Sequence, residues 1–241
     1  MNVSLLSFTP EPLRIIFTAA RSCYSPSAPS EIWEKASDED KMLALIKRTV
    51  DSGHHSVLEH VSFTFGVRGI SRACSHQLVR HRLASYSQQS QRYVRKTDAS
   101  AVVPGSISDV KKFREKFDAM LRQIGTFYNE LVEAGIPAED ARYILPNAVT
   151  TNIVITMNMR ELIHASSVRL CLRAQWEIRR LFLEMRKALE HNRETAPLSG
   201  FVLMKCEIIG FCDEADCCGI RPPKDEVLGL QKLTKGKVRA R

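Results

Sequence analysis

The sequence predicts an α+β fold. Segments with helical periodicity and segments with strand alternation are intermixed along the 241 residues without a regular βαβ rhythm. With 44% hydrophobic residues, a chain of this length can bury a sizeable core. The chain shows no internal repeat, so we expect a small number of helices packed with a few strands.

The first sixty residues are expected to form a strand and two helices. Residues 2–8 have strand character, and Pro12 can open a helix because the N–H it lacks would be unpaired there anyway. Residues 25–30 form a loop, after which Ser37 is the expected N-cap of the second helix, with Asp40 at the capping-box position and Gly53 as C-cap. The apolar faces of the two helices consist of Leu13, Ile16, Phe17 and Ala20, and of Met42, Leu45, Ile46 and Thr49.

The next segment combines a strand with a helix. Apolar residues alternate with small or polar ones from residue 61 to residue 67, which predicts a half-buried strand. Residues 70–80 follow a helical pattern, which would place Gln77, Arg80 and His81 on one face near the helix end. Residues 99–105 are a strand or a loop that Pro104 ends.

Two long helices dominate the second half of the predicted fold. Residues 108–134 form an amphipathic helix that Gly135 stops, and Pro137 opens a further helix to Leu145. Residues 150–159 are rich in strand formers, residues 159–191 form the second long helix, and residues 197–206 form a short final helix. The inward face of the first long helix is predicted to be Phe113, Phe117, Met120, Leu121, Ile124, Phe127, Tyr128 and Leu131.

The net charge of +8 is concentrated at one end of the chain. Residues 232–241 carry five basic residues and no acid, so the rest of the chain has a charge of only +3. The body therefore gives weak support to wholesale nucleic-acid binding. No secretory signal pattern is present, and the longest charge-free run, residues 143–159, contains Pro146 and three asparagines, which argues against a membrane span. We expect a soluble, cytoplasmic protein.

The most informative segment runs from Arg80 to Tyr93. Arg80, His81 and Arg82 are costly to bring together without an anion, and guanidinium groups match phosphate oxygens two at a time. The Ser, Gln and Tyr residues that follow can hydrogen-bond a polar ring, so the segment indicates a nucleotide-like ligand. The alternative is a solvated basic loop. Ser90 lacks a nucleophile elbow and is interpreted as a ligand contact.

Three further clusters carry less specific signals. Residues 53–60 contain three histidines and Glu59, but the spacing is not that of a zinc protease; contact with a cofactor and bonding to the backbone both remain open. Arg169, Arg173 and Arg180 would form one stripe on the second long helix, or a solvated face paired with glutamates. Four cysteines near the C-terminus have spacings that fit no standard zinc module, so reduced, unrelated thiols are expected: Cys206, Cys212, Cys217 and Cys218.

Four segments together resemble the flavin-dependent thymidylate synthases. Arg80-His81-Arg82, seven residues and Ser90 match the signature of that family, and residues 53–60 resemble its Gly-His-x-Ser-x-x-Glu-His segment. The remaining matches keep the family order up to about residue 180; they are Ala141-Arg142 with Leu145-Pro146, Asn158-Met159-Arg160, and Arg169 with Ala174-Gln175-Trp176-Glu177-Ile178.

The resemblance implies a fold, a reaction and a set of ligands. The fold would be a small, mostly antiparallel central sheet packed with long helices. The reaction would convert dUMP to dTMP, with 5,10-methylenetetrahydrofolate as carbon donor and NADPH-reduced FAD as hydride source. The chain would be a homotetramer whose active sites combine residues of several subunits. A nucleic-acid-binding protein that uses the arginine clusters and the basic tail is the alternative.

The resemblance also assigns residues by position. Arg169 would be catalytic, because it would favour the ionised N3 of the uracil. The FAD contacts would be Ser56, Arg80, His81, Arg82, Gln88, Asn158, Arg160 and His164. The dUMP contacts would be Gln77, Arg80, Gln88, Gln89, Ser90, Gln91, Arg92, Arg142 and Arg169. No metal ligand is implied.

Four positions depart from the family pattern, and the cysteine-rich C-terminus lies outside it. Family members often carry Asn-Glu where this chain has Ser87-Gln88, Gly where it has Gln91 and Asp where it has Cys171. We expect a single catalytic domain over residues 1–221 that includes the cysteine-rich segment, followed by a basic, flexible tail over residues 222–241.

Overall fold

The computed structural model describes residues 1–94 and 100–229. They fall into two compact units: unit 1 comprises Met1–Ser7 and Thr64–Thr156, and unit 2 comprises Phe8–Phe63 and Met157–Arg241. The expected basic tail lies largely outside the described residues, since residues 230–241 are not among them. Within the described residues, none of the helices has the length and apolar character needed to cross a membrane.

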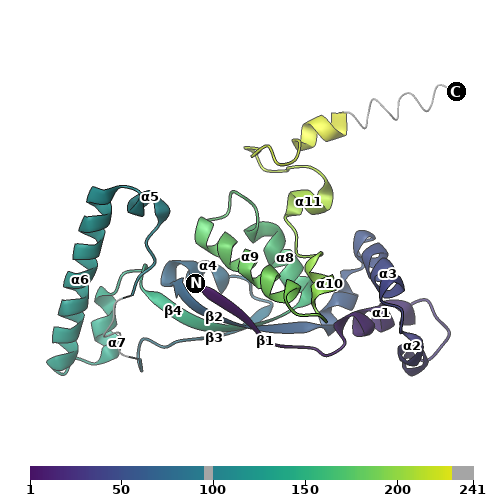
Figure 1. The fold of residues 1–241 in the computed structure, drawn as a ribbon, viewed down its shortest axis with the longest axis horizontal. Coiled ribbons are helices and arrows are strands. Elements are labelled where there is room, and N and C mark those ends of the chain that lie inside the picture. The colour runs from purple at the N-terminus through teal and green to yellow at the C-terminus, as the bar shows by residue number, and fades with distance from the viewer. Residues whose placement is uncertain (95–99, 230–241) are drawn as a thin grey trace. The chain divides into compact units, whose positions relative to one another are not determined.

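A four-stranded sheet forms the centre of unit 1 (Figure 1). Its strands are β1 (Asn2–Phe8), β2 (Ser62–Ser71), β3 (Ala84–Gln88) and β4 (Thr150–Asn158), in the spatial order β1-β2-β4-β3. The hydroxyl groups of Thr64 and Thr156 are 2.9 Å apart, and the Gly69 N–H donates to Asn152 Oδ1 at 3.2 Å. Because position rises along β2 as it falls along β4, these strands are antiparallel, as predicted.

Alternation along the two central strands buries one set of side chains and leaves the other accessible. The buried side chains of β2 and β4 include the apolar residues Phe63, Phe65, Val67, Ile153, Ile155 and Met157. This confirms the strands expected from residues 61–67 and 150–159 and the one expected from residues 2–8.

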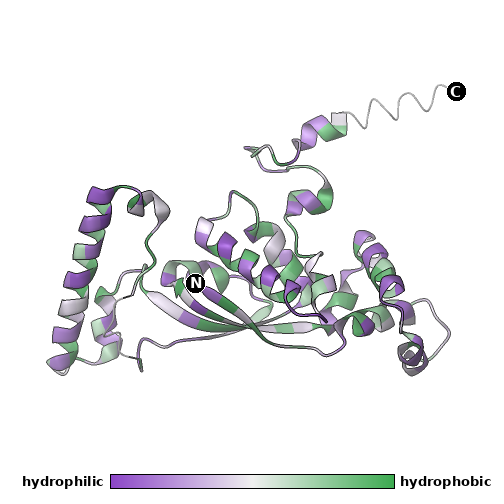
Figure 2. Ribbon diagram, in the orientation of Figure 1, coloured by the Kyte–Doolittle hydropathy of each residue, from purple (hydrophilic) through white to green (hydrophobic). Residues whose placement is uncertain are grey.

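The remaining elements of unit 1 are short helices and one long helix: α4 (Arg72–Leu78), α5 (Gly105–Ser108), α6 (Lys111–Glu133), α7 (Ala138–Ala141) and the 3-10 helix η2 (Arg142–Ile144). Among the described elements, α6 contacts α5, α7 and η2. Its hydrophobic residues are interspersed with hydrophilic ones (Figure 2). The predicted inward face is only partly correct, since Phe113, Met120 and Phe127 remain 55%, 57% and 49% exposed.

Unit 2 is helical. It contains α1 (Pro12–Ser22), α2 (Pro29–Lys35), α3 (Glu39–Asp51), the 3-10 helix η1 (His55–His60), α8 (Met159–Arg169), α9 (Trp176–Glu190), α10 (Ala196–Ser199) and α11 (Lys205–Ile209). Helix α1 packs against α2, α3 and η1, while α8 packs against η1, α9 and α11. The core of the second group includes Leu162, Ile178, Leu181, Phe182 and Met185, which are all fully buried.

Several predicted helix boundaries are wrong. The N-cap of α3 is Asp38 rather than Ser37, and its side chain accepts the Lys41 N–H at 3.1 Å. The carboxylate favours this position because it also faces the positive end of the helix. The helix expected over residues 70–80 is shorter, because β2 continues to Ser71, whose side chain caps α4 at Cys74 N.

The predicted helix over residues 159–191 is two helices, with a turn between Arg169 and Trp176. The segments over residues 137–145 and 197–206 likewise divide into α7 with η2 and α10 with α11. The sequence prediction also missed α2 and β3.

Candidate functional site

The Arg80-His81-Arg82 triplet lies in the turn between α4 and β3 in unit 1. Helix α4 ends at Leu78, so Gln77, Arg80 and His81 do not share a helical face as predicted. The Tyr86 hydroxyl lies 3.0 Å from the Leu78 carbonyl oxygen and 2.8 Å from that of His81, which ties the turn to the strand. His81 is 9% exposed, whereas Arg80 and Arg82 are exposed and can reach an external ligand.

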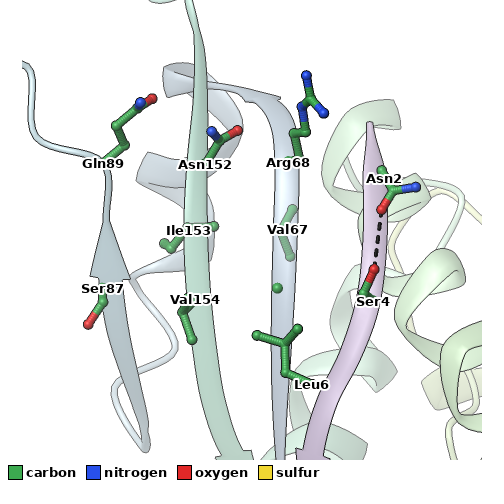
Figure 3. Close-up of a pocket in the computed structure, with 11 residues that line it drawn as sticks. Asn2, Ser4, Leu6, Val67, Arg68, Ser87, Gln89, Asn152, Ile153 and Val154 are labelled. Atoms are coloured by element: carbon green, nitrogen blue, oxygen red, sulfur yellow. Dashed lines mark hydrogen bonds between the residues drawn. The ribbon is translucent and has the colours of Figure 1, made fainter. Parts of the chain in front are cut away.

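Gln88, the last residue of β3, and Gln89, which follows it, point to opposite faces of the sheet. The Gln88 Nε2 group donates to Ser75 Oγ at 2.9 Å and to Thr151 Oγ1 at 3.3 Å. The Gln89 main-chain N–H donates to the Asn152 carbonyl at 2.9 Å. Its side chain lies with Ser87 on the other face of the sheet (Figure 3). Within one chain, the predicted contacts Gln88 and Gln89 therefore do not converge.

A hollow of about 500 Å³ lies over that accessible face of the sheet. Its floor combines Leu6 and Val154 with the polar side chains of Arg68 and Asn152 (Figure 3). A Cβ atom at Gly66 would lie 3.0 Å from Leu6 Cδ1, so the glycine makes room for this leucine. Among the described residues that line the hollow, Gln89 is the one predicted site residue.

Arginines gather instead around α7 and η2. The Arg92 Nε group pairs with the Glu139 carboxylate at 2.6 Å, and Arg142 Nε donates to the Glu139 carbonyl oxygen at 3.0 Å. Burial lowers the pKa of Arg72, and the nearby positive charge of Arg142 lowers it further. Ser90 belongs to the same segment, since its Oγ accepts the Arg92 N–H at 3.1 Å. Three guanidinium groups thus occupy one part of unit 1.

Arg72 is the member of this arginine group that the sequence prediction did not single out. It is the first residue of α4, and its main-chain N–H donates to the Val149 carbonyl at 3.1 Å. This bond joins two segments that are far apart in the sequence. The proximity of Arg72 to Arg142 therefore depends on how the strands are arranged, and no sequence pattern near residue 72 indicates it.

In unit 2, four predicted residues lie on two neighbouring elements. Ser56 is exposed on η1, and Arg160 and His164 are exposed one turn apart on α8, which packs against η1. Arg160 forms an ion pair with Glu59 of η1. Asn158 caps α8, because its Oδ1 accepts the Glu161 N–H at 2.9 Å.

The same region contains a buried carboxyl group and a bonded histidine. Burial raises the pKa of Glu161, which is 4% exposed, while the charge of His164 lowers it. The His55 ring nitrogen Nε2 lies 3.1 Å from the Val50 carbonyl oxygen. Of the two interpretations left open for residues 53–60, backbone bonding therefore accounts for His55, but Glu59 bonds a side chain on α8.

Arg169 stands in the last turn of α8 and is half-buried. The Gln175 Oε1 atom accepts the N–H groups of Glu177 and Ile178 at 3.0 and 3.1 Å, and this cap starts a new helix. The predicted stripe of Arg169, Arg173 and Arg180 on one helix is therefore wrong.

The comparisons with known proteins agree on one family. The family model described as thymidylate synthase complementing protein matches residues 4–197. The chain is 53% identical over 187 residues to a flavin-dependent thymidylate synthase of Geobacter sulfurreducens, covering 77% of this chain and 80% of the relative. It is 40% identical over 229 residues to that of Pyrococcus abyssi, covering 92% of each.

Solved structures give the same result. The flavin-dependent thymidylate synthase of Helicobacter pylori, complexed with FAD and dUMP, matches with a TM-score of 0.64 at 26% identity, over 84% of this chain and all of that one. A UMP/dUMP methylase of Streptomyces cacaoi bound with 5-Br dUMP matches with a TM-score of 0.70 at 25% identity, over 82% of this chain and 93% of that one.

Proposed function

Because the chain belongs to the family of flavin-dependent thymidylate synthases, we infer that it catalyses the reductive methylation of dUMP to dTMP. Bound FAD, reduced by NADPH, supplies the hydride, and 5,10-methylenetetrahydrofolate supplies the carbon. The alternative, a nucleic-acid-binding protein, finds no support in these comparisons. The observation that carries the function within the chain itself is the gathering of Arg72, Arg92 and Arg142 in unit 1.

That gathering fits the phosphate of a nucleotide. Like charges held near one another repel, and a dianionic phosphate offsets the repulsion while accepting paired hydrogen bonds from guanidinium groups. Glu139 holds Arg92 and Arg142 in place before any ligand arrives. We assign dUMP to Gln77, Arg80, Gln88, Gln89, Ser90, Gln91, Arg92, Arg142 and Arg169, and add Arg72.

Arg169 is our candidate for the catalytic group. By the resemblance to the family it would lie against the uracil, where its charge would stabilise negative charge that develops on the ring. Its half-buried position at the end of α8 supports this role, because partial burial strengthens an electrostatic interaction while leaving the group accessible.

The donor set of the chain also fits FAD. Exposed Arg80 and Arg82 suit a diphosphate, and η1 with α8 presents Ser56, Arg160 and His164 on adjoining surfaces. Asn158 holds the first turn of α8 and so positions Arg160. With His81 and Gln88, these residues form the proposed FAD-binding set.

We further propose a homotetramer with shared active sites, over a single catalytic domain of residues 1–221. In support, the Gln88 and Gln89 side chains face opposite sides of the sheet in one chain. A binding site that uses both glutamines would therefore take one from each of two copies of the chain. Helix α6 offers a surface for such a copy, because Phe113, Met120 and Phe127 recur on one face at a seven-residue interval and remain about half exposed. The ligands, all small and water-soluble, support a cytoplasmic location.

The charged residues beside this face of α6 could pair with those of a second copy. Lys116 lies seven residues before Gln123 and Glu130 lies seven residues after it, and all three side chains are exposed. In an antiparallel pair centred on Gln123, each Lys116 meets the Glu130 of the other copy. We therefore propose α6 as an interface between two copies of the chain.

The first test is the visible spectrum of the purified chain with FAD, followed anaerobically after NADPH addition, with and without dUMP. The proposed function predicts that the bound flavin bleaches in a dUMP-dependent manner. Arg169→Ala should keep its bound flavin yet lose dTMP formation by about two orders of magnitude or more. A chain that binds no flavin under any of these conditions would contradict the function.

A further inference from the structure

Polar side chains form a row across the accessible face of the sheet, within the hollow of about 500 Å³. All the residues that line this hollow belong to unit 1. Three members of the row come from β1, β2 and β4, and the fourth directly follows β3; they are Asn2, Arg68, Asn152 and Gln89 (Figure 3). Gln89 is the one member that belongs to the ligand sets proposed above, so the other three polar groups have no role in them.

This row presents hydrogen-bond donors. The Asn152 Oδ1 atom already accepts the Gly69 N–H at 3.2 Å, and the Asn2 Oδ1 atom accepts the Ser4 hydroxyl at 3.4 Å. The Nδ2 groups of the two asparagines are therefore the parts that remain for a ligand. Arg68 lies between them and is exposed, and among the described residues that line the hollow it is the one charged residue. A guanidinium flanked by amide donors, with no acid beside it in the lining, suits an anion.

The part of the hollow next to the row is apolar. Leu6 on β1 and Val154 on β4 are 57% and 40% exposed, and β2 lies between these strands. At this level β2 carries Gly66, which adds no side chain of its own (Figure 3). Two exposed aliphatic side chains on a sheet form a floor for a planar ring, because the ring removes their apolar surface from water. The hollow therefore suits a ligand that joins an aromatic ring to an anionic group.

Two ligands of the proposed reaction have no residues assigned to them above, namely NADPH and the folate. NADPH carries several phosphate charges, and a single arginine in the lining is a poor match for them. The folate ends in a benzoyl ring that an amide joins to a glutamate, so it offers an aromatic ring, a carbonyl oxygen and carboxylates in that order. These groups match the apolar floor, the asparagine donors and Arg68, whose planar fork fits a carboxylate. The hollow also includes Gln89, a proposed dUMP contact.

We propose that the hollow binds the p-aminobenzoyl-glutamate part of the folate co-substrate. Arg68 pairs with a glutamate carboxylate, Asn2 and Asn152 donate to the oxygen atoms beside it, and the benzoyl ring lies on the apolar floor. The inference rests on the proposed function, since the folate is the carbon donor of that reaction. Because these residues contact the part of the folate that does not react, they act on the affinity for the folate and not on the chemical step.

The test is equilibrium binding to the full-length protein loaded with FAD and dUMP, measured by anaerobic calorimetry with two probes. Tetrahydrofolate carries the glutamate carboxylates, and its dimethyl ester keeps the same framework without their charge. The parent should bind tetrahydrofolate about tenfold or more tightly than the ester. Arg68→Ala should lose this preference while its affinity for the ester changes little. Arg48→Ala, which removes an exposed arginine of α3 instead, should keep the preference of the parent.

Asn152→Asp tests the same point with a change that keeps a structural bond. The new carboxylate can still accept the Gly69 N–H, but a negative charge replaces the Nδ2 donors. This variant should therefore weaken the binding of tetrahydrofolate more than the binding of the ester. Circular dichroism shows whether each variant is folded.

Formation of dTMP by the same samples reports the proposed function separately. A preference for tetrahydrofolate that Arg68→Ala removes supports the folate site even if the parent forms no dTMP. The folate site is overturned, whether or not dTMP forms, by a parent that does not distinguish the two probes or does not bind tetrahydrofolate, or by a folded Arg68→Ala that keeps the preference. It is also overturned if Arg68→Ala lowers the mass of the assembly in sedimentation velocity but not the affinity for tetrahydrofolate, because a second copy of the chain would then occupy the hollow.

Discussion

The side-chain amide of Gln88 is the first donor in a short chain of hydrogen bonds that runs through Ser75 to the Arg72 carbonyl oxygen. The Ser75 hydroxyl donates to the Arg72 carbonyl at 2.9 Å, so its oxygen has a lone pair to accept the Gln88 Nε2 group. The same group donates to Thr151, which is 2% exposed. The family pattern used in the sequence analysis has Glu at this position, and an ionised carboxylate could only accept. In this chain the Gln88 amide instead donates to both hydroxyl oxygens.

Gln88→Glu tests this donation at the level of one residue. At neutral pH the carboxylate would oppose the Ser75 oxygen, or would turn the hydroxyl away from the Arg72 carbonyl. We expect a loss of about 1–3 kcal/mol of unfolding free energy. A protonated acid can donate again, so the deficit relative to the parent should shrink as the pH falls through the range in which the carboxyl takes up its proton. Urea unfolding of both proteins at several pH values measures this, and an unchanged or growing deficit at low pH would contradict it.

At the scale of elements, the sequence predicted strands better than helix ends. Residues 61–67 alternate strictly between apolar and small or polar residues, and Ile153, Ile155 and Met157 alternate in the later strand; this pattern follows directly from the pleat of a strand. The break that divides residues 159–191 into two helices could not be predicted from the sequence, because that stretch contains neither Gly nor Pro. Its second helix, α9, is capped by Gln175, a residue type outside the usual set of N-caps.

Helix α6 illustrates a second limit of prediction from sequence, which is that the partner of an apolar face is not known. Its heptad-like apolar pattern predicted an inward face, but periodicity shows only that a face will be covered, not that the same chain covers it. Phe113 and Met120 remain more than half exposed because the element contacts of α6 are with the short elements α5, α7 and η2.

Charge reversal tests whether a second copy covers α6. Lys116→Glu alone places two acidic pairs across the proposed antiparallel interface, and Glu130→Lys alone places two basic pairs there. Each change should weaken self-association about tenfold or more at low salt, whereas the double variant restores both pairs and should return to the parent value. Sedimentation velocity over a concentration series provides the measurement. Single variants that associate as the parent does, or a double variant as weak as the singles, would exclude this register.

At the scale of the whole molecule, the site motifs came from the sequence and their spatial grouping came from the fold. The order of the four matching segments was enough to indicate the family, which the comparisons confirm. The approach of Arg72 to Arg142 depends on packing between segments that are 70 residues apart in the sequence. Local periodicity has no access to such contacts.

The distribution of charge over the chain gives the last prediction. Residues 230–241 hold five of the positive charges, and the family match ends at residue 197, so the tail should be dispensable for the reaction. A chain that ends at Gly229 should keep dUMP-dependent dTMP formation within about twofold of the parent.

The same truncation separates catalysis from non-specific attraction to nucleic acid. Removing five charges should weaken binding to a random oligonucleotide and reduce its salt dependence by up to about five counterions. A full-length variant with Gln at Lys232, Lys235, Lys237, Arg239 and Arg241 is the matched control, since it keeps the length and removes the charge. If the truncated chain loses turnover while this control retains it, the tail acts through its length or its apolar residues. If both lose it, the charges serve the reaction, and the assignment of the tail as dispensable is wrong.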